Sequence, residues 1–556
     1  MIIRSVSSAR SCKTVHKSFN KKLFPIIIVS VSLFGLSGIS TNAIADNSGA
    51  LNGIERAFHA FKLRSRAAWR NFLEPLPEHP NNGDEISYES RLNSYTKGLP
   101  HDENGLVDGS AYRALRKALR SGKNDDFENI PKGVTGGLGL RNPHAAYSFL
   151  TEGKDPHSFT MPAAPSFSSA WQASDAMEVM WQALTRDVPF SEYDSNPVIA
   201  EAVADMNSMS DYRGASFNGL VTSQSLFRGV APGETTGPYI SQFLLMKIPY
   251  GATKVEQKYT VPVAGNDHMT DYDEWLHIQN GGKPTGITTV IYDEEPRYLY
   301  NGRAMAQYVL KDFVNQAYLN AAQIMRNFGS AAYDKNDPYK DSEQARSPLF
   351  GNNHAVDLLS RVSMSSQNVA WFQKWLVHRR ARPEVFFGHV HNHLIKEGVD
   401  YSLHEDVLSS SALEKVFLEK GTYLLPTATP KGSPLHPTYP AGHSVMAGAA
   451  VTMLKAFFNG DYVIPNPVMT SSDGLSLLPY EGDALTIEGE LNKLASNISL
   501  GRDIAGVHYR TDGDLGIALG EDFAITVLRE LVKTYNEEFD GFTFNRFDGT
   551  PIVISK

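Results

Sequence analysis

The chain has one cysteine among its 556 residues, and this scarcity excludes several kinds of site. A disulfide framework, a thiolate zinc site and an iron–sulfur cluster each need several cysteines. The sequence also lacks a basic excess, because 52 Lys and Arg residues stand against 61 Asp and Glu residues and give a net charge of −9. No nucleic-acid partner is therefore expected. Hydrophobic residues are abundant at 42%, which excludes a disordered or fibrous protein.

Acidic residues are missing from residues 1–45, which carry several Lys and Arg side chains. An apolar run at about 23–39 follows them, and Ala43-Ile44-Ala45 then gives a small-x-small pattern. This is typical of a secretory signal peptide cleaved after Ala45. The alternative is an uncleaved membrane anchor, for which the run is short and broken. We expect an exported protein, periplasmic or extracellular, with no stable membrane insertion after cleavage and no cysteine, since Cys12 lies in the leader.

The rest of the chain changes character near residue 300. Residues 46–300 are predicted to form an N-terminal helical and loop region packed on the core, and Gly, Pro and β-branched residues from 216 to 300 indicate loops and short strands. Residues 301–556 are predicted to form a C-terminal helical bundle, so the fold class is mainly α with few short strands. Helices are expected at 54–61, 111–120, 168–188, 302–328, 354–380, 411–420, 441–458, 486–504 and 514–535.

One acidic cluster could be a structural calcium loop. It contains Asp267, Asp271, Asp273 and Glu274. The cluster lacks the regular alternation and the terminal glutamate of an EF-hand, so calcium is the weaker interpretation.

Three segments concentrate basic and imidazole side chains in this acidic chain. In the first, Lys374 and Arg382 are eight residues apart, about two helical turns, so both are expected on a similar side of one helix. Pro383 follows directly, and it indicates that the helix ends or kinks there. Taken alone, this segment also fits a solvated basic helix end.

The second segment, residues 436–444, contains two prolines followed by an alanine-rich helix that begins near residue 441. A helix N-terminus offers free backbone N–H groups and the positive end of a dipole, which together bind oxyanions. Gly442 allows an anion to approach the backbone closely, and His443 can donate to the anion or transfer a proton. A capped helix with a surface histidine is the alternative.

In the third segment, Arg502 supplies a planar guanidinium whose N–H donors suit an oxyanion, and His508 follows six residues later. Together the segments read Lys-x7-Arg-Pro, Pro-x-Gly-His and Gly-Arg-x5-His, in that order. This order resembles the signature shared by vanadium-dependent haloperoxidases and type 2 phosphatidic acid phosphatases. Longer stretches resemble the bromoperoxidase branch and cover most of the chain after the leader: 186–190, 237–243, 273–276, 378–384, 432–440 and 505–509.

The resemblance implies a large helical-bundle haloperoxidase fold that holds one vanadate per chain. It implies that His508 is the axial vanadium ligand and that Lys374, Arg382 and Arg502 neutralise the equatorial oxygens. The Gly442 N–H would add a hydrogen bond. Three cations around a phosphate-like anion are physically reasonable, because charge-assisted hydrogen bonds are the strong ones.

The resemblance also implies a reaction. Hydrogen peroxide would oxidise bromide or iodide to a hypohalous species that halogenates small organic acceptors. His443 and Lys374 would be catalytic, His436 would act near the halide, and Trp371 would border the halide site together with His436. Relatives of this type form dimers or larger assemblies, so a homo-oligomer is expected.

The sequence departs from the family pattern at Ala441, where the family usually has serine. Loss of a charge-assisted hydrogen bond costs about 1.5–3 kcal/mol unless a water or a hydroxyl such as Ser433 or Ser444 replaces it. Two alternatives therefore stay open. One is a secreted acid phosphatase, with a phosphohistidine at His508 and His443 protonating the leaving group. The other is an oxyanion-binding protein without turnover, motivated by Ala441 alone.

Overall fold

The computed structural model describes residues 52–286 and 289–556. The leader, its cleavage site and Cys12 lie outside the described residues. Residues 63–556 form one compact unit, and the helix α1 (Gly53–Leu73) begins ahead of it. The predicted division of the chain near residue 300 stays a prediction.

Helices dominate the described part of the chain, and apart from α1 the longest of them lie after residue 350. The remaining α-helices are α2 (Asp84–Ser87), α3 (Gly109–Ser121), α4 (Asn124–Glu128), α5 (Ala170–Leu184), α6 (Pro197–Ser208), α7 (Tyr272–Gln279), α8 (Gly302–Lys311), α9 (Gln316–Arg326), α10 (Asn352–Phe372), α11 (Pro383–Ile395), α12 (Glu405–Leu408), α13 (Ser411–Lys420), α14 (Gly442–Phe457), α15 (Ile487–Ile504) and α16 (Arg510–Leu531). Short 3-10 helices are η1 (Pro143–Tyr147), η2 (Pro156–Ser158), η3 (Phe190–Glu192), η4 (Gln242–Leu244), η5 (Ser330–Ala332) and η7 (Val532–Thr534).

The strands form small antiparallel pairs, as the sequence predicts. Strand β1 (Ile248–Tyr250) pairs with β2 (Thr253–Val255), β3 (Val468–Thr470) with β4 (Leu477–Pro479), and β5 (Phe542–Asn545) with β6 (Pro551–Ile554). In these pairs Ile248 lies opposite Val255, Val468 opposite Pro479, and Phe542 opposite Ile554. Two-stranded pairs of this length cannot build a core of their own, so they depend on the helices for stability.

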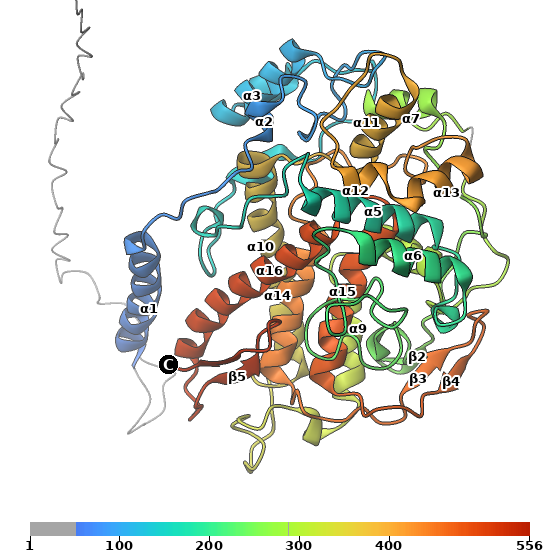
Figure 1. Ribbon diagram of the computed structural model, residues 1–556. Helices are drawn as coiled ribbons and strands as arrows, with labels where there is room; N and C mark the ends of the chain where they lie inside the picture. The colour runs from blue at the N-terminus through green and yellow to red at the C-terminus, as the bar shows by residue number, and fades with distance from the viewer. Residues whose placement is uncertain (1–51, 287–288) are drawn as a thin grey trace, which may run out of the picture. The chain divides into compact units, whose positions relative to one another are not determined.

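The centre of the fold is α14, which is buried along almost its whole length. Its sequence is rich in Ala, Val, Met and Gly on every side, and a helix that is apolar all round is buried in a core. Helices α10, α15 and α16 pack against it, and α8 packs against α15. Figure 1 shows α14, α15 and α16 side by side, with α10 behind them. The C-terminal segments therefore build the bundle that positions the site.

Glycines let α14 and α16 approach at backbone distance. A Cβ on Gly448 of α14 would lie 2.0 Å from the carbonyl oxygen of Ile517, and a Cβ on Gly520 of α16 would lie 2.0 Å from that of Val445. No side chain fits at such a distance, so only glycine permits this crossing. The close crossing fixes the start of α14 relative to the start of α16.

Two predicted helices are interrupted in the structure. The predicted helix at 302–328 is two helices, because the chain leaves helical geometry at Asp312 and α9 begins only at Gln316. The predicted helix at 354–380 ends earlier, in a π-helical turn η6 (Gln373–His378), and Arg379 then adopts a positive φ of 50°. Neither break contains a glycine or a proline, and the sequence therefore carries no local signal for either break.

The acidic cluster proposed for calcium is otherwise engaged. Asp267 pairs with Arg186, Arg303 and Lys420, and Asp271 caps α7 by accepting from the Glu274 N–H. Among the residues that the structure describes, no group of three or more His, Cys, Asp or Glu side chains is arranged to hold a metal ion. The cations at Asp267 and the capping role of Asp271 give no support to calcium at this cluster, the weaker interpretation of the sequence.

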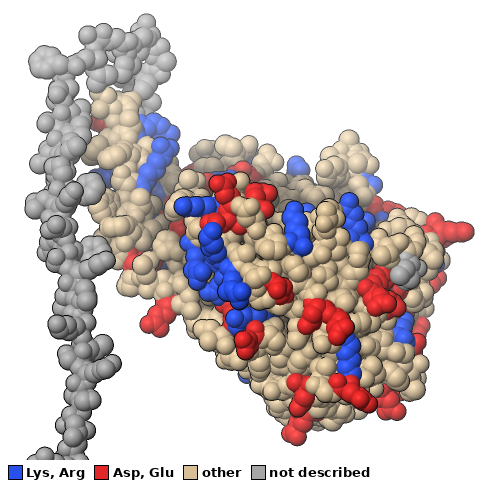
Figure 2. Space-filling view, turned by 90° about the horizontal axis from the view of Figure 1, so that it is seen from above, with Lys and Arg blue, Asp and Glu red and all other residues tan. Residues whose placement is uncertain are grey.

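Membrane and nucleic-acid partners call for particular features of the helices and the surface: apolar spans and areas of one charge. Within residues 52–286 and 289–556, no helix combines the length and hydropathy that a membrane span requires. The face drawn in Figure 2 carries basic and acidic side chains intermingled, so no single sign of charge covers it.

Candidate active site

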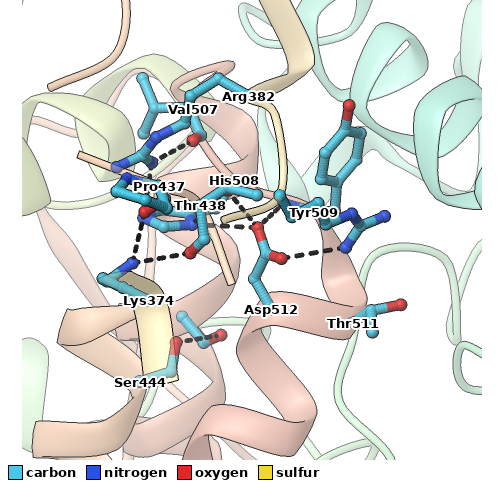
Figure 3. Close-up of polar contacts among 12 residues, drawn as sticks. Lys374, Arg382, Pro437, Thr438, Ser444, Val507, His508, Tyr509, Thr511 and Asp512 are labelled. Atoms are coloured by element: carbon cyan, nitrogen blue, oxygen red, sulfur yellow. Dashed lines mark hydrogen bonds and ion pairs between the residues drawn. The ribbon is translucent and has the colours of Figure 1, made fainter. Parts of the chain in front are cut away.

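Lys374 lies in the π-helical turn that follows α10, and its side chain is fully buried. The ammonium donates to the carbonyl oxygens of Pro437 at 2.8 Å and Thr438 at 2.7 Å, as Figure 3 shows. An ammonium has three donors, so one is left over. Burial, followed by the nearby guanidinium of Arg382, holds the pKa of Lys374 well below its usual range. An anion placed here would raise the pKa of Lys374 again and favour its charged form.

Arg382 precedes α11 and occupies its N-cap position. Its guanidinium is fully buried, with Nε donating to the carbonyl oxygen of His436 at 3.0 Å and Nη1 to that of Val507 at 2.6 Å. Nη1 also lies 2.9 Å from His508 Nε2, and Nη2 lies 3.0 Å from His436 Nδ1. Arg382 thus connects its own basic segment directly to both of the other two. It does so from a different helix than Lys374, because the chain turns between them at Arg379.

His508 lies just before α16, and its ring nitrogens have different surroundings. Nδ1 lies 3.1 Å from Asp512 Oδ2 and 3.0 Å from Thr438 Oγ1. A carboxylate can only accept, so it fixes the proton on Nδ1 and leaves the Nε2 lone pair free to accept from Arg382 or to bind a metal. Burial, and then the cations Arg382 and Lys374, hold the pKa of His508 well below its ordinary value. The imidazole is therefore neutral, which is the form that ligates metals.

Asp512 is itself held rigidly, so it can orient His508 and fix the proton on Nδ1. It is fully buried at the third position of α16, and its carboxylate accepts from the Tyr509 N–H at 3.0 Å and from Arg380 Nη1 at 2.9 Å. The Thr438 hydroxyl also donates to it. Its own carbonyl oxygen accepts from the Ala441 N–H at 2.8 Å. Asp512 therefore connects His508 to the start of α14.

The rings of His436 and Trp371 pack against each other in a tilted arrangement beside these groups. Their ring centroids are 4.9 Å apart with an interplanar angle of 37°, and the Lys374 ammonium lies 5.9 Å from the Trp371 ring. The indole N–H donates to the carbonyl oxygen of Arg141 at 3.1 Å, which fixes the ring. Burial, and then the neighbouring Arg382, lower the pKa of His436 well below its ordinary value, so this ring is neutral as well.

The N-terminus of α14 completes the same pocket. Ala441 is the N-cap residue and provides no side-chain acceptor for the first turn of the helix. The position of Gly442 is close to the indole, since a Cβ there would lie 3.3 Å from Trp371. His443 extends to Asp312, with its Nε2 3.1 Å from Asp312 Oδ1, and its side chain is 26% exposed. His443 and Trp371 are thus the two members of the group that are only partly buried.

The two hydroxyls considered as substitutes for a serine at position 441 have different surroundings. The Ser444 hydroxyl donates to Ser499 Oγ at 2.8 Å, so it is engaged elsewhere (Figure 3). The Ser433 hydroxyl is buried and has no partner among the described residues. Thr438, which sequence reasoning did not consider, contributes its hydroxyl to His508 and Asp512 instead.

Arg502 enters from the last turn of α15. Its Nη1 donates to the carbonyl oxygen of Val309 at 2.7 Å, while its buried Nε has no partner within the described chain. Burial lowers its pKa, and its charge in turn depresses the pKa values of Lys374 and His508. The structure therefore brings all eight predicted site residues into one region.

The charge balance of this region tests whether it suits an oxyanion. Lys374, Arg382 and Arg502 are all buried, and within residues 52–286 and 289–556 none of them forms an ion pair with a carboxylate. Other buried cations do, such as Lys97 with Glu384 at 2.6 Å. Buried charges without a partner are costly, so a ligand must supply the negative charge. With the unprotonated Nε2 of His508, which accepts from Arg382 Nη1, and the unused Nε–H of Arg502, the donor set fits a metal oxyanion.

Comparison with known proteins identifies the family of this chain. Residues 411–537 match the family model described as the VCPO second helical-bundle domain. A vanadium-dependent bromoperoxidase of Ascophyllum nodosum is 36% identical over 540 residues, covering 93% of this chain and 95% of the relative. The chain belongs to the vanadium-dependent bromoperoxidases. One from Corallina officinalis is 32% identical over 595 residues, covering 90% of this chain and 98% of the relative.

A solved structure agrees with this membership of the bromoperoxidase family. The second vanadate-dependent bromoperoxidase of Ascophyllum nodosum, described as homohexameric, superposes with a TM-score of 0.87 at 30% identity. The match covers 93% of this chain and 94% of that one. The predicted fold class is therefore confirmed, and the comparisons favour a bromoperoxidase over the phosphatase alternative.

Sequence reasoning missed two carboxylates of this bromoperoxidase site. Asp512 follows His508 by four residues, but the predicted last helix begins at 514, so Asp512 was not placed in its first turn. Asp312 lies in the break between α8 and α9, where a continuous helix is predicted. An acidic residue four positions after a candidate histidine ligand was the available signal for Asp512. No signal in the sequence connects Asp312 to His443.

Proposed function

We propose that this protein is a vanadium-dependent haloperoxidase that uses hydrogen peroxide to oxidise bromide or iodide. In this reaction halide, hydrogen peroxide and a proton give hypohalous acid and water, and the hypohalous acid then halogenates an organic acceptor. The proposal rests on three buried cations that form no ion pair with a carboxylate of the described chain, beside the unprotonated Nε2 of His508. When bound, vanadate supplies a Lewis acid that makes hydrogen peroxide electrophilic toward halide.

We propose specific residues as the holders of that vanadate. His508 Nε2 is the metal ligand, since Asp512 fixes the proton on the other nitrogen. Lys374, Arg382 and Arg502 neutralise the oxygens, each from a different helix or turn. The Gly442 N–H donates to the same anion from the uncapped start of α14. These groups are already in place, but Arg382 Nη1 would have to give up its contact with His508 Nε2 when the ion binds.

Other residues handle the proton and the halide. His443 is engaged by Asp312 through Nε2, so its second nitrogen is available to hold or release a proton at the site. Solvent can replenish that proton, because the side chain is partly exposed. Lys374 donates its third N–H toward the anion. Trp371 and the neutral His436 form the wall where we place the halide, since an anion there contacts a ring edge and the nearby ammonium.

Export and assembly are part of the proposal. The basic, acid-free residues 1–45 with their apolar run support a cleaved signal peptide and a periplasmic or extracellular enzyme. A homo-oligomer is supported by the homohexameric description of the related Ascophyllum nodosum enzyme.

The test is reconstitution with vanadate. The protein freed of vanadate is titrated with it, and bromination of a cyclic diketone is followed with bromide and hydrogen peroxide. We expect activity that requires all three additions and saturates at one vanadate per chain. His508→Ala should abolish activity, whereas His157→Ala, at an exposed histidine paired with Asp155, should leave it unchanged.

Three results would count against the proposal. Full activity in His508→Ala would show that His508 is not the vanadium ligand. Hydrolysis of phosphate esters that vanadate inhibits, without any bromination, would favour the phosphatase alternative. Tight vanadate binding without turnover under any condition would favour a binding protein.

A further inference from the structure

A cavity of about 430 Å³ opens beside the site, and the reaction proposed above does not use it. Its volume falls within the usual range for small-molecule sites, about 300–1,000 Å³. The lining residues combine aromatic rings with polar ends: Tyr259, Thr260, Tyr292, Gln307, Tyr308, Lys311, Asp312 and Gln316. Such a lining suits a ligand that combines a flat ring with a polar group.

Two rigid parts of the fold form the walls. One wall is the last turn of α8 together with the start of α9. The other consists of two extended segments that pair with each other, because Tyr259 exchanges backbone hydrogen bonds with Arg297 at 2.8 and 2.9 Å. A bridge between Pro262 and Tyr292 continues this pairing. The aromatic side chains are thus presented from paired backbone and a helix, which makes the cavity preformed.

The tyrosines provide ring faces and one unused hydroxyl. Tyr259 and Tyr308 meet edge to face, with centroids 5.0 Å apart and an interplanar angle of 74°. The Tyr259 hydroxyl donates to Gln257, but the hydroxyl of Tyr308, a residue only 3% exposed, has no partner among the described residues. A buried hydroxyl without a partner is costly unless a ligand supplies one. Tyr292 is 39% exposed and so leaves an aromatic face at the entrance.

The cavity is connected to the site through one side chain. Asp312 lines the cavity, and its carboxylate lies 3.1 Å from His443. Any molecule in the cavity is therefore next to the residue that we assign to proton transfer. A ligand here would intercept hypohalous acid as it leaves the vanadate site.

We propose that this cavity is the binding site for a phenolic acceptor. A phenol matches the lining, since its ring can stack on the tyrosines while its hydroxyl meets Tyr308, Gln307 or the Lys311 ammonium. This inference rests on the proposed function for its halogen source. The step is an aromatic substitution in which a ring carbon–halogen bond forms, the carbon–hydrogen bond breaks, and the proton leaves with the hydroxide of hypohalous acid as water.

Binding is tested first, without peroxide or halide. Saturation-transfer NMR with phenol should give a signal on the wild-type protein, and cyclohexanol, which has the same hydroxyl but no aromatic ring, should give little. Tyr292→Ala and Tyr308→Phe should each weaken phenol binding about fivefold, the scale of one aromatic contact or hydrogen bond. Tyr250→Ala, which removes another exposed tyrosine outside the cavity, is the matched control and should bind phenol normally.

Turnover gives the second readout. With bromide and peroxide, the wild-type enzyme should give a ratio of 2-bromophenol to 4-bromophenol that differs from the ratio given by reagent hypobromous acid. Tyr292→Ala should shift this ratio toward the reagent value, whereas the control Tyr250→Ala should keep the wild-type ratio. Absence of phenol binding, or a wild-type ratio equal to that of the reagent, would overturn the inference. If no acceptor is halogenated at all, the proposed function fails, and the binding arm still decides the cavity.

Discussion

Replacement of Asp512 by asparagine tests how His508 is held ready for a metal. The carboxylate accepts from His508 Nδ1, from the Tyr509 N–H, from Thr438 and from Arg380, and it is fully buried. An asparagine keeps the size but replaces one acceptor oxygen by an NH2 group. If that group faces His508, the proton moves to Nε2, and the lone pair that would bind vanadium is lost.

The expected magnitude follows from the second-shell role of Asp512. Loss of a partner that orients a histidine ligand costs about 10–100-fold in metal affinity, which is about 1.4–2.7 kcal/mol. The Arg380 ion pair is also weakened, so the free energy of unfolding should fall too. Asp175→Asn separates the two effects, because Asp175 pairs with the same Arg380 at 3.2 Å and makes no contact with His508.

The assay is a titration of each vanadate-free variant with vanadate, with bound metal measured after equilibrium dialysis and unfolding followed in parallel. We expect Asp512→Asn to bind vanadate about 10–100-fold more weakly than Asp175→Asn, while both lose some stability. Equal vanadate affinity in the two variants would refute the tautomer argument. It would show instead that only the ion pair with Arg380 matters.

Four further predictions follow from other parts of the structure. Ala441→Ser gives α14 an N-cap hydroxyl and should raise the free energy of unfolding by about 1 kcal/mol, measured by urea denaturation, and tighten vanadate binding in the dialysis assay. Asp312→Asn should lower kcat for bromination by about 10²-fold with a smaller change in vanadate affinity, because it disturbs the histidine that moves protons. Burial raises the pKa of Glu234 to about 8, so the folded state holds this proton more tightly than the unfolded chain, and the stabilisation is full at acidic pH and lost as the pH rises toward 8. At pH 9 the free energy of unfolding of Glu234→Gln should therefore exceed that of wild type by an amount on the order of 2 kcal/mol. At pH 5 the two proteins should be equally stable. Gly520→Ala should cost about 1–3 kcal/mol in the same denaturation assay, while Gly139→Ala, where a Cβ meets nothing within 4 Å, should be neutral.

Sequence reasoning succeeded where the physical signal is local. The predicted helix at 411–420 coincides with α13, and the predicted helix at 441–458 differs from α14 by one residue at each end. The extended approach to α14 and its apolar composition are properties of consecutive residues. Periodicity and turn chemistry report such elements directly.

Sequence reasoning failed where several segments act on one another. Lys374 and Arg382 do share a site, but the predicted reason, one face of a continuous helix, is wrong, since a π-helical turn and Arg379 separate two helices. The pairing of Asp312 with His443 joins residues 131 positions apart. Such contacts arise from tertiary packing, and no pattern within a short window encodes them.

The glycine crossing of α14 and α16 has a consequence for the life of the enzyme. Because the two backbones touch at Gly448 and Gly520, the starts of these helices cannot drift apart while the core is intact. Gly442 at the start of α14 and His508 just before α16 are therefore positioned by the fold and not by the ion. An enzyme made in water poor in vanadium would keep these groups in the positions that bind the ion. It could then load the ion long after synthesis, without a chaperone and without refolding.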